Sequence, residues 1–187
     1  TTEQIGEWKH NRTPIPEQIR ILADIVKYLY SIVKDEQMIY YSVENNNIGE
    51  AALIVIRDIG EENFPGLFLS EPIRKGHVRK FRKGFNTTHK SKISCAARLK
   101  HLIESNKMKI WSKPLITELK AFIATGVTFK AKVGEEDDLV SALLLIVRMS
   151  EVLADWDPRV FESFSSNDSY NEEDFELPMP IFVSSAI

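Results

Sequence analysis

Apolar and polar residues recur with two different periods along the first 156 residues of the chain. Apolar residues that return every three to four positions predict one buried face of a helix. The clearest example is the run from residue 17 to 33, which contains Ile21, Ile25, Leu29 and Ile32. This period predicts five helices, at Glu17–Val33, Gly49–Ile59, Ile93–Ser105, Pro114–Ala124 and Asp137–Leu153.

Short runs rich in β-branched and aromatic residues lie between these helices and predict strands. The predicted strands are Ile5–His10, Met38–Val43, Gly66–Ser70, Met108–Trp111 and Val127–Lys132. Strands that alternate with helices are typical of an α/β domain. The pattern fails after Trp156, where residues 161–176 are polar and acidic and residues 177–185 are apolar again. We therefore expect a domain over residues 1–156 and an acidic, flexible tail over 157–187 that ends in an extended segment.

Composition narrows the class of protein. The 187 residues are 43% hydrophobic and carry a formal net charge of −3, which suits one soluble domain without a global attraction to nucleic acid. The single cysteine, Cys95, excludes an internal disulfide framework and a cysteine-rich zinc site. No uncharged apolar stretch is long enough to cross a bilayer, so no membrane partner is expected.

One carboxylate stands at the end of an apolar strand. Glu44 follows the run IYYSV, and three asparagines and a glycine come soon after it. Ligands of open α/β sheets usually bind at the carboxyl ends of strands, where a carboxylate could hold a divalent cation. The alternative is that Glu44 is a solvated residue that merely ends the strand.

Four carboxylates open the last predicted helix, in GEEDDLVSALLLIVRM over residues 134–149. One or two acidic residues stabilise a helix N-terminus by capping and through the helix dipole. Four in succession repel one another, and a bound cation would relieve that repulsion. A strand-end Glu44 and a helix-start Asp138, supported by Asp137, would suit a site that holds two Mg²⁺ or Mn²⁺ ions for phosphoryl transfer.

Residues 74–92 form a basic stretch without a single acid. Its positive residues are Arg74, Lys75, Arg79, Lys80, Arg82, Lys83, Lys90 and Lys92. Contacts to DNA phosphates need positive charge and hydrogen-bond donors rather than base-specific geometry. The stretch therefore predicts binding to the DNA backbone, the alternative being a solvated charged loop.

Three motifs in this order resemble the nuclease domain of the large terminase subunit, most closely that of T-even-type tailed bacteriophages. They are IYYSVENNNIGE, TTHKSKISCAARLKHLIES and GEEDDLVSALLLIVRM, and the resemblance spans roughly residues 3–155. It implies an RNase H-like mixed sheet flanked by helices, related to Holliday-junction resolvases. It also implies that two divalent metals held by three acids cleave concatemeric double-stranded DNA.

The resemblance assigns roles to individual residues. The second acid of the family falls on Glu44, and the third falls on Asp138 with Asp137 beside it. A lysine near the scissile phosphate is expected at Lys92, with Lys90 as the second choice. Many members of the family carry a histidine just before the acidic pair, where this chain has Glu136.

The chain departs from the family at its beginning. The family's first acid is an aspartate on the first strand, and the first aspartate here is Asp24, inside a predicted helix. We expect that the family's first strand or two and this catalytic aspartate are missing, so that the fragment alone is an incomplete nuclease. No GxxxxGK[ST] phosphate-binding loop occurs, so the ATPase domain is also absent from this chain.

These observations predict a metal-dependent endodeoxyribonuclease domain of a viral genome-packaging terminase. The resemblance implies double-stranded DNA, the terminase ATPase domain, the small terminase subunit and the portal protein as partners. The implied location is the viral procapsid in the cytoplasm of a bacterial host. Two alternatives remain, a non-catalytic module that grips DNA within the packaging motor and another RNase H-like nuclease such as a resolvase.

Overall fold

The computed structural model describes residues 1–75, 78–125 and 128–155, and the predicted tail at 157–187 lies outside them. Five α-helices are present, α1 (Ile15–Val33), α2 (Asn47–Ile59), α3 (His89–Glu104), α4 (Lys113–Ala121) and α5 (Asp138–Ala154). All five predicted helices are therefore confirmed. Helix α3 begins four residues earlier than predicted, because Thr88 and Ser91 form a capping box at its start.

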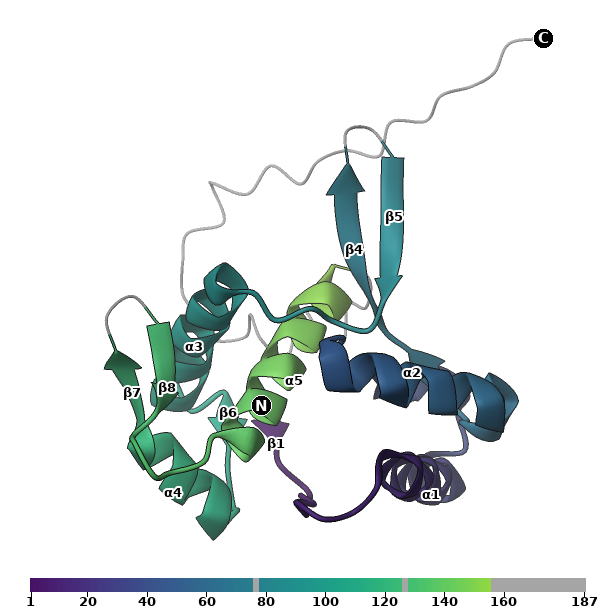
Figure 1. Ribbon diagram of the computed structural model, residues 1–187, viewed down its shortest axis with the longest axis horizontal. Helices are drawn as coiled ribbons and strands as arrows, with labels where there is room; N and C mark the ends of the chain where they lie inside the picture. The colour runs from purple at the N-terminus through teal and green to yellow at the C-terminus, as the bar shows by residue number, and fades with distance from the viewer. Residues whose placement is uncertain (76–77, 126–127, 156–187) are drawn as a thin grey trace, which may run out of the picture.

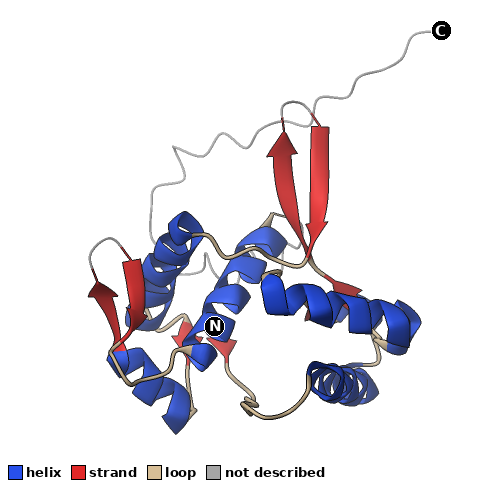
Figure 2. Ribbon diagram, in the orientation of Figure 1, coloured by secondary structure: helices blue, strands red, loops and turns tan. Residues whose placement is uncertain are grey.

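The described strands pair two by two (Figure 2). Two pairs are parallel, β1 (Thr2–Glu3) with β6 (Met108–Lys109) and β2 (Tyr40–Tyr41) with β3 (Leu67–Phe68). Two are antiparallel hairpins, β4 (Ser70–Lys75) with β5 (Val78–Lys83) and β7 (Phe122–Thr125) with β8 (Thr128–Ala131). Two 3₁₀ turns, Glu36–Met38 and Glu61–Asn63, precede β2 and β3. The architecture is mixed α/β, with small sheets among the helices.

Two predictions about strands and loops are wrong. The segment Ile5–His10 is not a strand, because its pairing with β6 ends at Gln4, whose N–H donates to the carbonyl of Lys109 at 3.0 Å. Ile5 beyond that point is 85% exposed. The basic stretch is not simply a loop, since residues 74–75 and 78–83 belong to the hairpin β4–β5 and residues 89–92 begin α3. The hairpin projects from the rest of the molecule (Figure 1).

The predicted helix Pro114–Ala124 is also too long. Helix α4 stops at Ala121, because the chain from Phe122 to Thr125 extends into β7 and pairs with β8. Residue Phe122 ends the helix in an extended conformation, and its ring stacks on that of Phe129 with centroids 5.9 Å apart.

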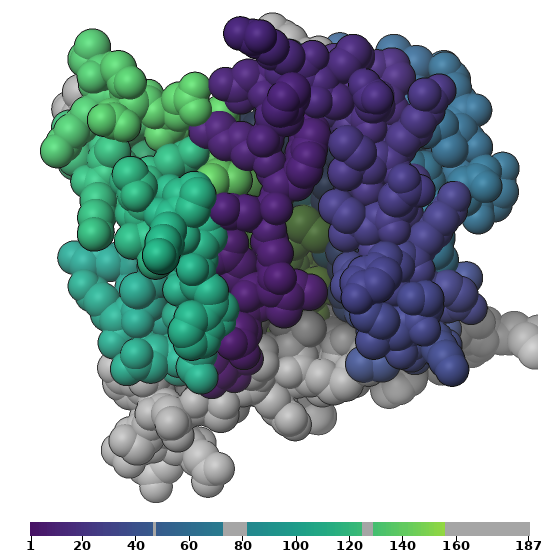
Figure 3. All heavy atoms as spheres, turned by 90° about the horizontal axis from the view of Figure 1, so that it is seen from below, coloured from purple at the N-terminus to yellow at the C-terminus, as the bar shows by residue number. Residues whose placement is uncertain are grey.

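Buried apolar residues form two separate clusters. The first cluster joins α3, β6, α4 and α5. The second joins α1, β2, α2 and Phe64. Figure 1 shows the first group around α5 and the second group beside it, and in Figure 3 the N-terminal residues, darkest purple, run between the green segments and α1. The start of the chain therefore bridges the two halves.

Helix α5 is apolar on nearly every face, which is typical of a fully buried helix, yet it is buried on one side only. Five of its residues are buried in the first cluster, Leu139, Val140, Leu143, Leu144 and Val147. Ile146 is 47% exposed and lines a cavity of about 260 Å³ together with residues of the N-terminal segment. Within the described residues, no helix is long and apolar enough to cross a membrane.

Candidate functional site

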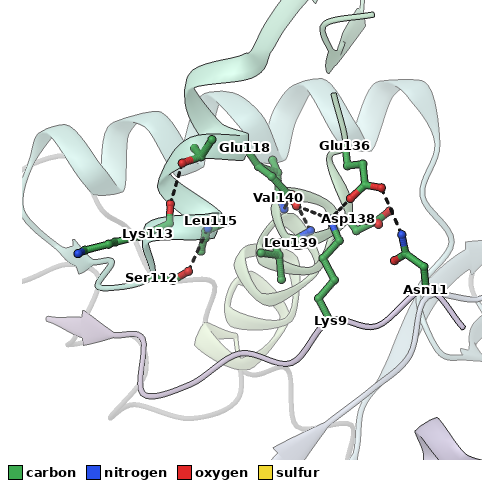
Figure 4. A network of polar contacts seen from close by, with 11 residues as sticks. Lys9, Asn11, Ser112, Lys113, Leu115, Glu118, Glu136, Asp138, Leu139 and Val140 are labelled. Carbon is green, nitrogen blue, oxygen red and sulfur yellow. Dashed lines mark hydrogen bonds and ion pairs between the residues drawn. The ribbon is translucent and has the colours of Figure 1, made fainter. Parts of the chain in front are cut away.

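The acidic start of α5 is held by a lysine from the N-terminal segment (Figure 4). The Nζ atom of Lys9 lies 2.6 Å from Glu118 Oε1, 2.6 Å from Glu136 Oε2 and 3.4 Å from Asp138 Oδ2. Glu118 above all, and then Glu136, raise the pKa of Lys9 above its ordinary value through hydrogen bonds. The same lysine lowers the pKa of Glu136. One ammonium group thus contacts three carboxylates.

A second lysine contacts the neighbouring acid. The Nζ atom of Lys92 lies 3.2 Å from Asp137 Oδ2 and 5.3 Å from the centroid of the Phe122 ring. Lys92 stands in the first turn of α3, which the capping box of Thr88 and Ser91 fixes. The start of α3 and the start of α5 therefore meet through this ion pair, although the two residues are 45 positions apart.

Glu44 lies at the end of a paired stretch, as its sequence position predicts. Its backbone forms a bridge with Phe85, and the N–H of Asn45 donates to the carbonyl of Phe85 at 2.6 Å. The residue is half-buried. The asparagines that follow are structured, because Asn46 caps α2 and accepts the N–H of Gly49 at 3.0 Å.

The segment that holds Glu44 contacts α5 far from its acidic start. The ring of Phe85, the bridge partner of Glu44, lies 5.8 Å from the guanidinium carbon of Arg148. Arg148 and Asp138 are ten residues apart on α5, which is about 15 Å along the helix axis. Among the described residues, no group of three or more histidine, cysteine or acidic side chains is arranged to hold a metal ion. That Glu44 shares a cation with Asp138 stays a prediction.

The donor chemistry fits a divalent cation only in part. Asp137 and Asp138 supply adjacent carboxylates, the hard oxygen ligands that Mg²⁺ prefers. Their present partners are ammonium groups of Lys92 and Lys9, cations whose place a metal would take. Two neighbouring carboxylates suit one ion, and the full two-ion set is not assembled by the residues that the structure describes.

The predicted DNA-binding residues fall on the hairpin and on the start of α3. Arg74 pairs with Arg79 and Ile73 with Lys80 across β4 and β5. The side chains of Arg74, Lys75, Arg79 and Lys80 lie outside what is described. Of the remaining cations, Arg82, Lys83 and Lys90 are exposed, and Lys83 forms an ion pair with Glu61.

Two residues at the site, Lys9 and Glu118, escaped the sequence analysis, as did Arg148 farther along α5. Glu118 had a signal, since it occupies a buried position on the apolar face of α4 between Leu115 and Ala121. A carboxylate there needs a partner, because burying an unpaired charge is costly. Lys9 and Arg148 carried no such signal, because their partners are distant in the sequence.

No protein-family model matches the chain, and a search of curated proteins finds no match.

Proposed function

We propose that the chain is an RNase H-like nuclease domain that cleaves double-stranded DNA with a divalent metal, as the large terminase subunit of tailed bacteriophages does. We thus assign the mixed α/β architecture to the RNase H-like fold and propose hydrolysis of a phosphodiester as its reaction. The expected partners are DNA and, in a packaging motor, the terminase ATPase domain, the small subunit and the portal protein.

The contact between Lys92 and Asp137 carries the proposal. Two motifs that resemble the nuclease, far apart in the sequence, meet at 3.2 Å in the positions where the resemblance implies a scissile-phosphate lysine and a metal-binding acid. Asp138 is 62% exposed beside them. The chain that leads into α3 comes directly from the base of the basic hairpin.

Each group of residues at the site would have a distinct role in DNA hydrolysis. A divalent cation held by Asp137 and Asp138 would supply Lewis-acid activation of water at a phosphodiester. Lys92, already positioned by α3, would then donate to a non-bridging oxygen of that phosphate and stabilise the charge that develops there. The hairpin cations would hold neighbouring phosphates without reading the base sequence.

The test is nicking of supercoiled plasmid by the 187-residue chain in Mg²⁺ or Mn²⁺. We expect Asp138→Asn to reduce the nicking rate by at least about 100-fold. A neutral amide binds a divalent metal much more weakly than a carboxylate, so the negative charge that develops on the phosphate would be less stabilised. Asp58→Asn is the matched control, since Asp58 is an exposed aspartate on α2 that pairs with the neighbouring Arg57. Equal loss in both variants would contradict the assignment.

A second function is favoured by one observation. The exposed cations Arg82, Lys83 and Lys90 would suffice for a module that grips DNA without cutting it. DNA binding without nicking, in a chain shown to begin at its native N-terminus, would support that module. Preference for branched over linear DNA would instead indicate a resolvase.

A further inference from the structure

Glu118 of α4 contacts the start of α5 with one carboxylate oxygen and Lys9 with the other (Figure 4). Its Oε2 atom accepts the N–H of Leu139 at 2.8 Å and the N–H of Val140 at 3.2 Å. Its Oε1 atom accepts from Lys9 Nζ at 2.6 Å. The residue is only 9% exposed, so these contacts are shielded from water.

The amides that Glu118 binds are those that a helix normally caps with its own side chain. Leu139 and Val140 are the second and third residues of α5, and an aspartate at the N-cap position ordinarily accepts from these two N–H groups. Asp137 is the N-cap residue of α5, yet its side chain makes no capping hydrogen bond. Its carboxylate contacts Lys92 instead.

We infer that Glu118 is a positioning residue for the acidic start of α5, because it caps the helix in place of Asp137 and so releases the Asp137 carboxylate to Lys92. Through Lys9 the same side chain also holds Asp138. The functional meaning of this cap rests on the proposed function. In the nuclease that we propose, the cap would leave the N-cap aspartate available to a metal and a substrate. The capping itself is independent of any bound ion.

The inference predicts that the effect of a Glu118 substitution on the melting temperature depends on residue 137. In Glu118→Ala, Asp137 is free to turn back and cap its own helix, so the melting temperature falls little while the contact with Lys92 is lost. In the Asp137→Ala background no residue can take over the cap, and the same Glu118→Ala change lowers the melting temperature by clearly more. A merely structural glutamate would give the same shift in both backgrounds.

The experiment is this double-mutant cycle on the metal-free chain, read by thermal melting and by hydrogen exchange at the amides of Leu139 and Val140. We expect exchange at both amides to rise at least about tenfold only when both caps are removed. Glu118→Gln, whose amide oxygen still accepts both N–H groups, should retain protection. Lys120→Ala, an exposed change on the same helix, should match the wild type. Identical melting shifts in the two backgrounds, with protection unchanged in the double variant, would overturn the inference.

The nicking assay separates this inference from the proposed function. Glu118→Ala should lower the nicking rate at least about tenfold without changing DNA affinity, and Glu118→Gln should restore most of it. A wild-type chain that never nicks, but whose double-mutant cycle behaves as expected, would refute the nuclease and leave the capping role standing. Glu118→Asp, too short by one methylene to reach both amides, replaces the alanine variant if that variant does not fold.

Discussion

At the scale of single residues, Gly49 shows how closely α2 packs against the backbone of Glu44. Gly49 lies in the first turn of α2, and a Cβ atom at this position would stand 1.6 Å from the carbonyl oxygen of Glu44. That oxygen belongs to the backbone and cannot move aside without shifting Glu44 itself. The glycine is therefore required by close packing rather than by helix preference.

The substitution Gly49→Ala should accordingly destabilise the protein, by about 1–3 kcal/mol, as overpacking usually does. In an ordinary helix the same change would stabilise by roughly 1 kcal/mol. The measurement is urea denaturation followed by circular dichroism. The control is Gly6→Ala, where no atom lies within 4 Å of the added carbon, and its effect should stay within about 0.5 kcal/mol. A stabilised Gly49→Ala variant would show that Glu44 is not held as described.

At the scale of elements, the hairpin β4–β5 is the main candidate surface for DNA. Gly84 lies at the base of the hairpin with a φ of 69°, a conformation that glycine adopts readily. The absence of a side chain at this position leaves room for the carbonyl of Val43. The Nδ2 atom of Asn45 donates to the carbonyl of Lys83 at 2.8 Å and fixes the same corner. The hairpin is thus fixed at the segment that carries Glu44.

The exposed cations near this hairpin should contribute unequally to DNA binding. Neutralising Arg82 and Lys90 together should weaken binding and lower the slope of log affinity against log salt by up to about 1.8, at roughly 0.9 per phosphate contact. Lys83→Gln should have a smaller effect, because Lys83 is already paired with Glu61. Fluorescence anisotropy with duplex DNA over a salt series measures both quantities.

The control for this series is Lys130→Gln, an exposed lysine on β8 in the other hairpin. Its slope should equal that of the wild type. A slope unchanged in the Arg82 and Lys90 double variant would remove the hairpin and the start of α3 from the DNA-binding surface.

The element scale also shows what the sequence could and could not predict. The helices followed from apolar residues at helical spacing, although the face predicted for α1 is not the buried one. Ile25 and Ile32 are 44% and 60% exposed, whereas Ile19, Ala23 and Val26 are buried. The hairpin was missed, because a two-stranded ribbon rich in Lys and Arg has no clean alternation of apolar and polar residues. The strand predicted at Ile5–His10 failed because apolar content alone does not provide a pairing partner.

At the scale of the whole molecule, Arg148 connects the two groups of packed elements. On α5 it forms an ion pair with Glu71 of β4, donates to the carbonyl of Asn86 at 3.1 Å and lies over the ring of Phe85. Glu71 in turn accepts the N–H of Asn86 at 3.0 Å. Both charged side chains are largely buried, at 21% and 15% exposed. This network ties the hairpin base to the helix that carries Asp138.

Replacing Arg148 by methionine should therefore loosen the link between the two clusters. We expect a loss of about 2–3 kcal/mol, somewhat less than for a fully buried pair, because the carboxylate of Glu71 loses its partner. Tryptophan fluorescence and circular dichroism should report one coincident urea transition in the wild type and two separate ones in the variant. The double variant Arg148→Met, Glu71→Met should recover part of the loss.

Coincident transitions in Arg148→Met would contradict this role, since the two clusters would then be coupled by other contacts. The sequence could not predict the network, because Arg148 and Glu71 are 77 positions apart and each looks like an ordinary surface charge. The same holds for Lys9, which finds its carboxylates 109 or more positions away. Candidate acids were visible in the sequence, whereas the cations that restrain them depend on the tertiary fold.

The β4–β5 hairpin joins the rest of the molecule at one end only, so its length can vary. Its two strands leave and re-enter the body at one corner, so paired residues added or removed farther out would alter its reach without disturbing that corner. Lengthening each strand by two residues would extend the hairpin by roughly 7 Å, which is about two phosphate spacings along one strand of a duplex. The reach of the DNA contact that we propose for this hairpin would therefore depend on the length of its strands and not on the segment that carries Glu44.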